Sequence, residues 1–416
     1  MNIRPHNEAF LLQSREQNDK IVSQPLSPVV QSFELTTIKG IVESCLKIKE
    51  QPDEVYNYSS KGNLIGIITN GSAVFDLGNI GALASKPAIN KKALLLKKYA
   101  GVDVFDIELN TLDVDVFVRT VITISPTFGA IDLESIKAPE CFEIEHRLMD
   151  ALDIPVMHVD QHGTAIVSAA GLLNACEIAG KSLSQIKLVI NGAGTSALAC
   201  ANLYLSLGLK KENLIMLDSK GVISHNRMDI DKYKKVFATN TYLNSLEEAL
   251  SGADAFVGLS KGDILTPGMI KSMADHPIIF AMANPIPEID YYNAIKANAK
   301  VIYASCKREY PNEINNILGF PFIFRAALDT RASKINDEMK KAAVFAIASL
   351  AKEPLVISNK SHSHPFGRAY FLPKASDPRL AKKVVQAVAK AAIASGVASK
   401  TITDWKAHEK NIDKLS

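Results

Sequence analysis

The sequence predicts an α/β protein in which an N-terminal α/β domain precedes a doubly wound domain built on a parallel sheet. Three observations predict this. A chain of 416 residues is long for one hydrophobic core, so we expect two domains. Beyond residue 186, short apolar segments typical of buried strands alternate with helical segments. A glycine-rich turn directly follows the first of these strands.

The chain divides into three parts by composition. Residues 1–30 are polar and irregular, and we interpret them as an N-terminal arm. An N-terminal domain follows at 31–155, and a C-terminal domain with a helical layer occupies 156–416. We place the boundary near 150–163 because the residues beyond it become small and apolar.

In the N-terminal domain, the apolar run at 64–69 predicts a short buried strand that ends at the turn pair Asn70-Gly71. Alternating apolar and polar residues at 102–107 predict a second strand. Residues 92–99 predict a helix that ends before Gly101.

In the C-terminal domain, residues 165–179 predict a buried helix that ends at Gly180. Alanine-rich segments at 332–356 and 378–396 predict the helical layer. The expected strands lie at 186–190, 213–217, 255–259, 277–282 and 301–303.

Composition and charge exclude several classes of partner. The net charge is +3 and no basic patch stands out, so we expect no nucleic acid. No apolar run reaches the roughly 20 residues of a membrane span, and the first residues lack the apolar core of a secretory signal. Five cysteines without close spacing suit a reduced compartment, so we expect a cytoplasmic protein.

The glycine-rich turn carries the pattern of a Rossmann-like dinucleotide site, because it lies between a predicted strand and a predicted helix. Gly192 permits the tight turn and Gly194 lets the backbone approach a pyrophosphate. The helix that follows offers free N–H groups to phosphate oxygens. A structural turn that binds no nucleotide is the alternative. The candidate residues in the turn are Gly192, Gly194, Thr195, Ser196 and Ala197.

The second predicted strand ends in Asp218, 26 residues beyond Gly192 (218 − 192). A carboxylate at this distance accepts a hydrogen bond from a ribose 2′-hydroxyl, which favours NAD. Ser219 and Lys220 follow directly, and these side chains suit a 2′-phosphate. The sequence therefore leaves NAD and NADP both open.

Several blocks in the same order resemble the malic enzymes of the bacterial short-chain type, over about residues 50–405. The resemblance implies an N-terminal domain for substrate and metal, and oxidative decarboxylation of malate to pyruvate and CO2 with NAD or NADP and Mg²⁺ or Mn²⁺. It also implies a homodimer. The blocks lie at 58–63, 78–83, 97–106, 125–142, 154–165, 218–222, 283–285, 310–312 and 315–329.

By this resemblance, Lys92 matches the catalytic lysine, whose pKa we expect to be lowered by dehydration and neighbouring cations. The alternative is a surface lysine beside Lys91, Lys97 and Lys98. Asn284 matches a cofactor-side asparagine and Asn316 a substrate-side one; a turn before proline and a helix cap are the alternatives.

The metal-binding segments depart from the family pattern. Glu134 and Asp160 match two of the carboxylate ligands. Ser135 replaces the third, and Val159 replaces a carboxylate beside the metal. Hard divalent cations take oxygen ligands, mostly carboxylates, so we expect a weak or absent metal.

Other positions depart as well. Thr37 occupies the place of the catalytic tyrosine, with Lys39 as a conceivable substitute, and Asp76 and Cys306 replace loop glycines. The pair His362 and His364 resembles a metal clip but lies in a polar loop. His158 and His162 belong to the resembling motif, either as groups behind the site or as structural side chains.

We therefore predict a malic-enzyme-like protein whose activity on malate is impaired or redirected. The alternatives are a non-catalytic dinucleotide-binding relative and an enzyme that acts on a different hydroxy acid.

Overall fold

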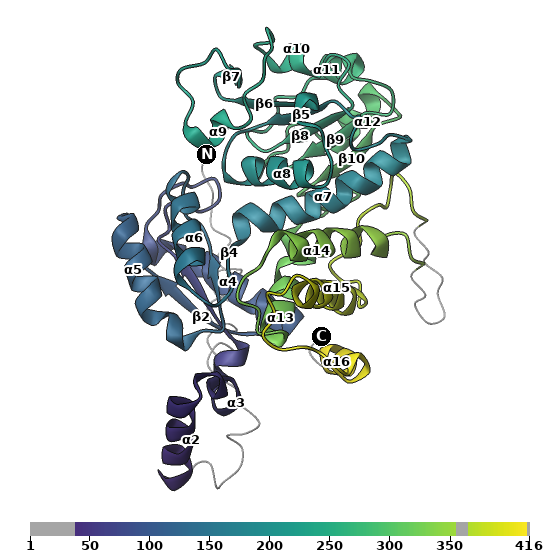
Figure 1. Cartoon of the computed structure of the whole chain (residues 1–416). Coiled ribbons are helices and arrows are strands. Elements are labelled where there is room, and N and C mark those ends of the chain that lie inside the picture. The colour runs from purple at the N-terminus through teal and green to yellow at the C-terminus, as the bar shows by residue number, and fades with distance from the viewer. Residues whose placement is uncertain (1–37, 355–364, 414–416) are drawn as a thin grey trace, which may run out of the picture.

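The computed structural model describes residues 38–354 and 365–413. Two α/β domains lie one above the other, and a layer of C-terminal helices covers their junction (Figure 1). Each domain has its own parallel sheet, which confirms the predicted fold class.

The N-terminal sheet has four parallel strands in the order β2-β1-β3-β4. They are β1 (Leu64–Thr69), β2 (Asp103–Glu108), β3 (Ala130–Leu133) and β4 (Val156–His158). The strands expected at 64–69 and 102–107 are present, whereas β3 and β4 were not predicted. Because β4 pairs with β3, this sheet extends to His158, beyond the boundary that we placed at residue 155.

Helices cover both faces of this sheet. α5 and α6 pack on one face around Phe117, Ile131 and Leu148, while α4 and the distant α13 cover the other. The short helices α2 and α3 project from the body of the molecule (Figure 1). The bounds are α2 (Ile38–Glu50), α3 (Val55–Tyr58), α4 (Ala82–Ala100), α5 (Val114–Ile124) and α6 (Glu140–Ala151).

The C-terminal sheet has six strands in the order β10-β9-β8-β5-β6-β7. Five are parallel and confirm the predicted strands within two residues at most ends. The sixth, β7, is a two-residue edge strand antiparallel to β6, which the sequence did not suggest. The strands are β5 (Leu188–Asn191), β6 (Leu214–Asp218), β7 (Gly221–Val222), β8 (Ala255–Gly258), β9 (Ile278–Ala281) and β10 (Ile302–Ser305).

Helices α7 and α8 pack on one face of this sheet, and α10, α11 and α12 pack on the other. Beneath α7 lie α13, α14 and α15; the last two are the helices predicted at 332–356 and 378–396, and α13 was not predicted. The bounds are α7 (Val159–Ala179), α8 (Thr195–Ser206), α9 (Lys232–Lys235), α10 (Leu246–Leu250), α11 (Pro267–Ser272), α12 (Tyr291–Ala297), α13 (Phe320–Asp329), α14 (Asp337–Leu350), α15 (Leu380–Ala394) and α16 (Trp405–Asp413). Short 3₁₀ turns lie at η2 (Pro52–Glu54), η3 (Ser60–Asn63), η4 (Ser125–Thr127), η5 (Lys211–Asn213) and η6 (Asn316–Leu318).

The buried helix α7 begins at Val159, six residues earlier than we predicted from 165. Its small side chains allow α8 and α14 to approach closely. Two of its buried polar side chains make internal hydrogen bonds: Tyr204 donates to Ser168 Oγ at 2.8 Å, and the Asn174 amide nitrogen donates to two backbone carbonyls at 2.9 Å each. Among the helices of the described residues, none combines the length and apolarity needed to cross a membrane.

The two glycines of the turn between β5 and α8 differ in how much room they leave for a side chain. Gly192 has φ +128°, and a Cβ there would lie 2.5 Å from the Leu259 carbonyl oxygen. Gly194 has φ −87°, and a Cβ there meets nothing within 4 Å. We expect Gly192→Ala to lower the free energy of unfolding by about 2 kcal/mol or more, and Gly194→Ala by less than about 1 kcal/mol. Denaturant unfolding without nucleotide measures both; equal losses would contradict the geometry.

Candidate active site

A buried cluster of charged side chains forms where two neighbouring strands of the N-terminal sheet end. Glu134 directly follows β3, and Asp160 lies in the first turn of α7, directly after β4. Carboxyl ends of adjacent parallel strands meet at one sheet edge. From the helix that covers this face, α4, the Lys92 ammonium contacts Glu134 Oε1 at 2.7 Å. The structure therefore brings together three residues that are far apart in sequence.

Lys92 is not a surface lysine, because its side chain is only 15% exposed and its ammonium lies 5.1 Å from the centre of the Phe320 ring. Burial lowers its pKa, but the negative charges of Glu134, Asp160 and Asp132 outweigh burial and raise the pKa above its ordinary value. Our expectation of a lowered pKa was wrong for this arrangement. The neighbours of this ammonium are carboxylates rather than cations.

The two candidate metal ligands share one environment. Burial and the nearby Asp160 charge raise the pKa of Glu134 to about 8. Burial opposes ionisation of Asp160 too, yet the Lys92 charge and the Ser135 N–H hold the pKa of that carboxyl below its usual range. The two carboxyls also hydrogen-bond to each other. A shared proton and an ammonium thus keep like charges together in a buried space.

The substituted positions lie in this cluster. The Ser135 N–H donates to Asp160 Oδ2 at 2.8 Å, and its backbone has φ +55°, a region that Asp and Asn tolerate better than most residues. Val159 is fully buried and contributes only apolar surface. The oxygen donors of Glu134 and Asp160 suit Mg²⁺ or Mn²⁺. Within residues 38–354 and 365–413, however, no three Asp, Glu, His or Cys side chains already converge on one point.

A fourth charged residue, Asp132, was missed by sequence reasoning. It lies on β3 two residues before Glu134, so both side chains point to the same face of the sheet. Asp132 is fully buried, and the Val159 N–H acts on its carboxylate as a hydrogen-bond donor. Burial and the charge of Glu134 raise its pKa well above the ordinary value. Only its strand position relative to Glu134 could have signalled it.

The β4–α7 junction is held by Glu145 of α6, which sequence reasoning also missed. Its carboxylate accepts from the His158 N–H at 2.7 Å and from Gln161 Nε2 at 3.0 Å, and it contacts His162 Nε2 at 3.1 Å. Burial opposes ionisation, but the charge of His162 lowers the pKa of Glu145 to about 2. His162 therefore supports the site from behind. The ring nitrogens of the buried His158 have no hydrogen-bond partner.

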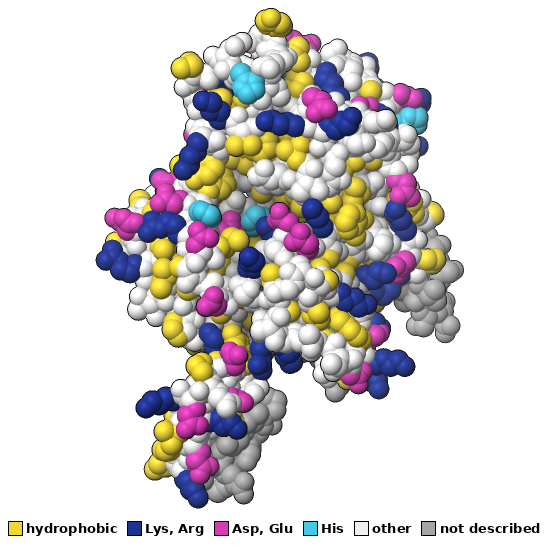
Figure 2. Space-filling model, viewed as in Figure 1, with side chains coloured by type: hydrophobic (Ala, Val, Ile, Leu, Met, Phe, Trp, Pro, Cys, Tyr) yellow, Lys and Arg dark blue, Asp and Glu magenta, His cyan; other side chains and the backbone are white. Residues whose placement is uncertain are grey.

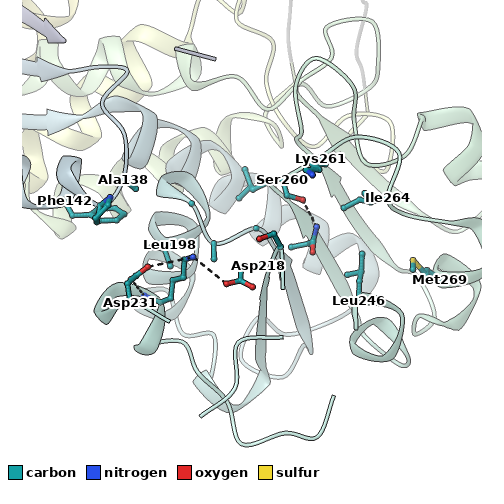
Figure 3. Close-up of a pocket in the computed structure, with 18 residues that line it drawn as sticks. Ala138, Phe142, Leu198, Asp218, Asp231, Leu246, Ser260, Lys261, Ile264 and Met269 are labelled. Carbon is teal, nitrogen blue, oxygen red and sulfur yellow. Dashed lines mark hydrogen bonds and ion pairs between the residues drawn. The ribbon is translucent and has the colours of Figure 1, made fainter. Parts of the chain in front are cut away.

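Beside this cluster lies a cavity of about 730 Å³ at the carboxyl ends of β5 and β6 (Figure 3). Gly192, Gly194 and Asp218 line it, as the dinucleotide pattern predicted. The open space over Gly194 is where a pyrophosphate would approach the backbone. Phe142 and Ala138 of the N-terminal domain also line the cavity.

Asp218 lies among cations at the end of β6, pointing into the cavity in Figure 3. Arg227 binds both of its carboxylate oxygens, at 2.7 and 3.0 Å, and the Lys234 ammonium lies 3.6 Å away. Burial raises its pKa, but these cationic partners bring the net pKa below the ordinary value. Sequence reasoning identified Lys220 but missed Arg227 and Lys234, which approach only in the fold.

Other candidate residues of the turn do not line this cavity. Ala197 is buried against the core. The Ser196 hydroxyl donates to the Asp160 carbonyl oxygen at 2.7 Å, which ties α8 to α7 rather than facing outward. Thr195 begins α8, and its side chain hydrogen-bonds to Cys141. Asn284 is exposed in the loop after β9.

Of the neighbouring pair Asn315 and Asn316, only Asn315 has a side chain that caps a helical turn. Asn315 is the cap, because its side chain accepts from the Ile317 N–H at 3.2 Å. Asn316 lies against the first turn of α7, where a Cβ added to Gly163 would be 2.9 Å from the Asn316 Cβ. Asn316 therefore reaches the helix that carries Asp160.

The other positions that differ from the family pattern lie away from the charged cluster or outside the described residues. Asp76 is exposed in the turn between Val74 and Gly78. The Cys306 thiol donates to the Met282 carbonyl at 3.4 Å, and burial raises its pKa to about 12. Lys39 is exposed on the projecting α2. Thr37, His362 and His364 lie outside the described residues.

Comparison with known proteins agrees with this arrangement of two domains. Residues 29–149 match the family model of the malic enzyme N-terminal domain, and residues 161–393 match that of the malic enzyme NAD binding domain. An NADP-dependent malic enzyme of Halomonas elongata is 48% identical over 363 residues, which are 86% of each chain.

An NADP-dependent malic enzyme of Haemophilus influenzae is 48% identical over 91% of this chain, but only 50% of that relative is covered. The chain thus spans about half the length of that relative. A malic enzyme from Pyrococcus horikoshii has a similar crystal structure, with a TM-score of 0.85 and 36% identity over 92% of this chain and 88% of that one. By both family models and these identities, the chain belongs to the malic enzyme family.

Proposed function

We propose that this protein oxidatively decarboxylates malate to pyruvate and CO2 with NAD(P), at a rate reduced by its substituted site. The observation that carries the proposal is the buried contact of Lys92 with Glu134, next to Asp160 and beside the glycine-lined cavity. Removing a hydride from a hydroxy acid and then losing CO2 requires three things. A base must accept the hydroxyl proton, carboxylates must hold a cation, and a dinucleotide must lie close enough to take the hydride.

The side chains of the cluster have distinct roles in this proposal. Glu134 and Asp160 would hold a divalent cation, which supplies polarisation of the substrate's hydroxyl and carbonyl oxygens when bound. Once these carboxylates turn to a cation, they no longer raise the pKa of Lys92, so its amine can accept the C2 hydroxyl proton. Glu145 and Ser196 hold α7 in place, and Asn316 lies where a substrate carboxylate would meet α7.

The same residues support a reduced rate. Ser135 contributes a backbone N–H but no negative charge, and Val159 contributes none. Thr37 carries an aliphatic hydroxyl, which is a weaker proton donor than a phenol. Loss of a general acid alone costs about 10²–10⁴ in rate.

Turnover of malate tests the proposal directly. We expect slow formation of NAD(P)H with malate and Mn²⁺, which EDTA abolishes. Lys92→Met should lower kcat about 100-fold or more, because it removes the proton acceptor. Lys98→Met, on the exposed side of the same helix, is the matched control.

The triple variant Thr37→Tyr, Ser135→Asp and Val159→Asp should raise kcat at least about tenfold.

Two outcomes would contradict this proposal. Turnover that survives Lys92→Met would remove the lysine from the chemistry. No turnover by either the wild type or the triple variant, with NAD(P) still raising the Tm, would instead indicate a non-catalytic dinucleotide-binding protein or a different hydroxy acid as substrate.

We also propose that NADP is accepted as well as NAD. A 2′-phosphate would displace Asp218 from Arg227 and Lys234, while a 2′-hydroxyl would donate to that carboxylate. We expect Arg227→Ala to raise KM for NADP about 10–100-fold, the value of one charge-assisted pair, and to change KM for NAD much less. Asp218→Asn should raise KM for NAD more than KM for NADP. Equal effects of Arg227→Ala on both cofactors would contradict the assignment.

We further propose a cytoplasmic homodimer, in keeping with five free thiols. The projecting α2 exposes an apolar stripe (Figure 2), with Ile38 83%, Ile41 50%, Val42 50% and Leu46 53% accessible. Covering such a stripe favours association. Light scattering should show a dimer whose Kd rises at least about tenfold with Leu46→Glu. Met228→Glu, at an apolar side chain elsewhere that is 96% exposed, should leave this Kd unchanged. A monomeric wild type would refute the dimer.

A further inference from the structure

The apolar stripe of α2 carries a positive charge at its border. Ile38, Val42 and Leu46 are exposed at intervals of four residues, so these side chains share one face of the helix. Lys39 borders this face, and its side chain is 88% exposed. Its ion pair with Glu43, at 4.0 Å, lies in water, where such pairs contribute little. The Lys39 ammonium is therefore available to a partner.

A second exposed apolar surface lies on the turn between Val74 and Gly78, which follows β1. The Val74 N–H donates to the Gly78 carbonyl oxygen at 2.9 Å and closes the turn. Phe75 is 65% exposed and Leu77 63%, and the exposed Asp76 lies between them. Phe75 also has φ +50°, a conformation that is costly for a bulky side chain. Large apolar side chains gathered on one exposed turn are typical of a surface that binds another protein.

The two surfaces complement each other. Both are apolar, so contact between them would remove apolar area from water. The helix carries an ammonium beside its apolar side chains, whereas the turn carries the Asp76 carboxylate between its own. Opposite charges at the edge of an apolar contact fix its register. Asp76 replaces a loop glycine of the family pattern, so this negative charge is a feature of this chain.

Within one chain the two surfaces cannot meet. β1 begins after α3 and ends at the turn, and its six residues span roughly 20 Å. α2 comes before β1 and projects away from the body of the molecule (Figure 1). The Lys39 ammonium can therefore reach an Asp76 carboxylate only in a second copy of the chain.

We propose that α2 of one protomer packs on the turn at 74–78 of the other, where Lys39 pairs with Asp76 of the partner subunit. This rests on the proposed homodimer, and two-fold symmetry makes the same contact twice. The turn also adjoins the candidate active site, because the Ala73 N–H donates to the Ser135 carbonyl oxygen at 3.0 Å. The contact thus joins the partner to the loop beside the charged cluster.

A zero-length carbodiimide, which joins a carboxylate to an amine in direct contact, tests the pair in the wild-type chain. Ordinary and isotope-labelled protein are mixed, left to exchange subunits, cross-linked and digested, and mass spectrometry identifies the joined peptides. We expect a cross-link between Lys39 and Asp76 that joins a labelled to an unlabelled peptide. A dimer that yields no such cross-link, or only cross-links within one chain, would overturn the inference.

Charge reversal measures the same pair by affinity. Lys39→Glu and Asp76→Lys should each raise the Kd of the dimer about fivefold or more, because like charges then face each other. The double variant should return within about threefold of the wild type. Lys47→Glu, on the opposite face of α2, is the matched control and should leave the Kd unchanged. A Kd that Asp76→Lys does not change, or that the double variant does not restore, contradicts the pairing.

The Cys45 thiol reports the same contact without any change of charge. All five cysteines are among the described residues and only Cys45 is exposed, three residues after Val42 on the apolar face. Its reaction with a thiol reagent should slow about fivefold or more when the dimer forms, because access is lost. Asp76→Lys, at the same protein concentration, should restore the fast reaction.

The outcomes separate this inference from the proposed homodimer. A wild type that stays monomeric would refute the homodimer, and the inference would fail with it. A dimer in which Cys45 reacts as fast as in the monomer would leave the homodimer standing and overturn only the contact between α2 and the turn.

Discussion

The contact between Lys92 and Glu134 is the interaction on which the site depends. Both side chains are largely withdrawn from water, and the Lys92 ammonium offsets part of the cost of burying the carboxyls of Glu134 and Asp160. The pairing of Lys92 with Glu134 places α4 against the end of β3. Asp160 adds a second carboxyl from the neighbouring strand end, and the pKa values of all three groups then depend on one another.

The position of that cluster relative to the dinucleotide cavity depends on helix α7. Its first turn carries Asp160, and its N-terminal end is held by Glu145 of the N-terminal domain. The Ser196 hydroxyl then bonds the Asp160 carbonyl to the first turn of α8, the helix that begins at the glycine turn. Through these hydrogen bonds, the charged cluster of one domain and the glycine turn of the other are held at a set separation. The start of α7 therefore contacts both the charged cluster and the glycine turn.

The substitutions in this chain alter charge more than shape. Ser135 retains the backbone N–H that binds Asp160, and its positive φ is the conformation that an aspartate would also adopt. Val159 fills its place as a packed apolar side chain. The fold of the malic enzyme family is thus retained while two positions beside the buried cluster carry no negative charge.

The sequence alone determined β1, β2, the five parallel strands of the C-terminal sheet, the glycine turn after β5 and Asp218 at the end of β6. Each of these is a local pattern of neighbouring residues. A run of apolar residues before Gly192 forms a buried strand wherever it packs, and φ +128° at Gly192 needs glycine. The short β3 and β4, the antiparallel β7 and the true start of α7 could not be predicted, because they depend on pairing across the chain. Arg227, Lys234 and Glu145 were missed for the same reason. The direction of the Lys92 pKa was decided only by the tertiary structure, since the lysines beside it in sequence point elsewhere and the carboxylates that face it come from β3 and α7.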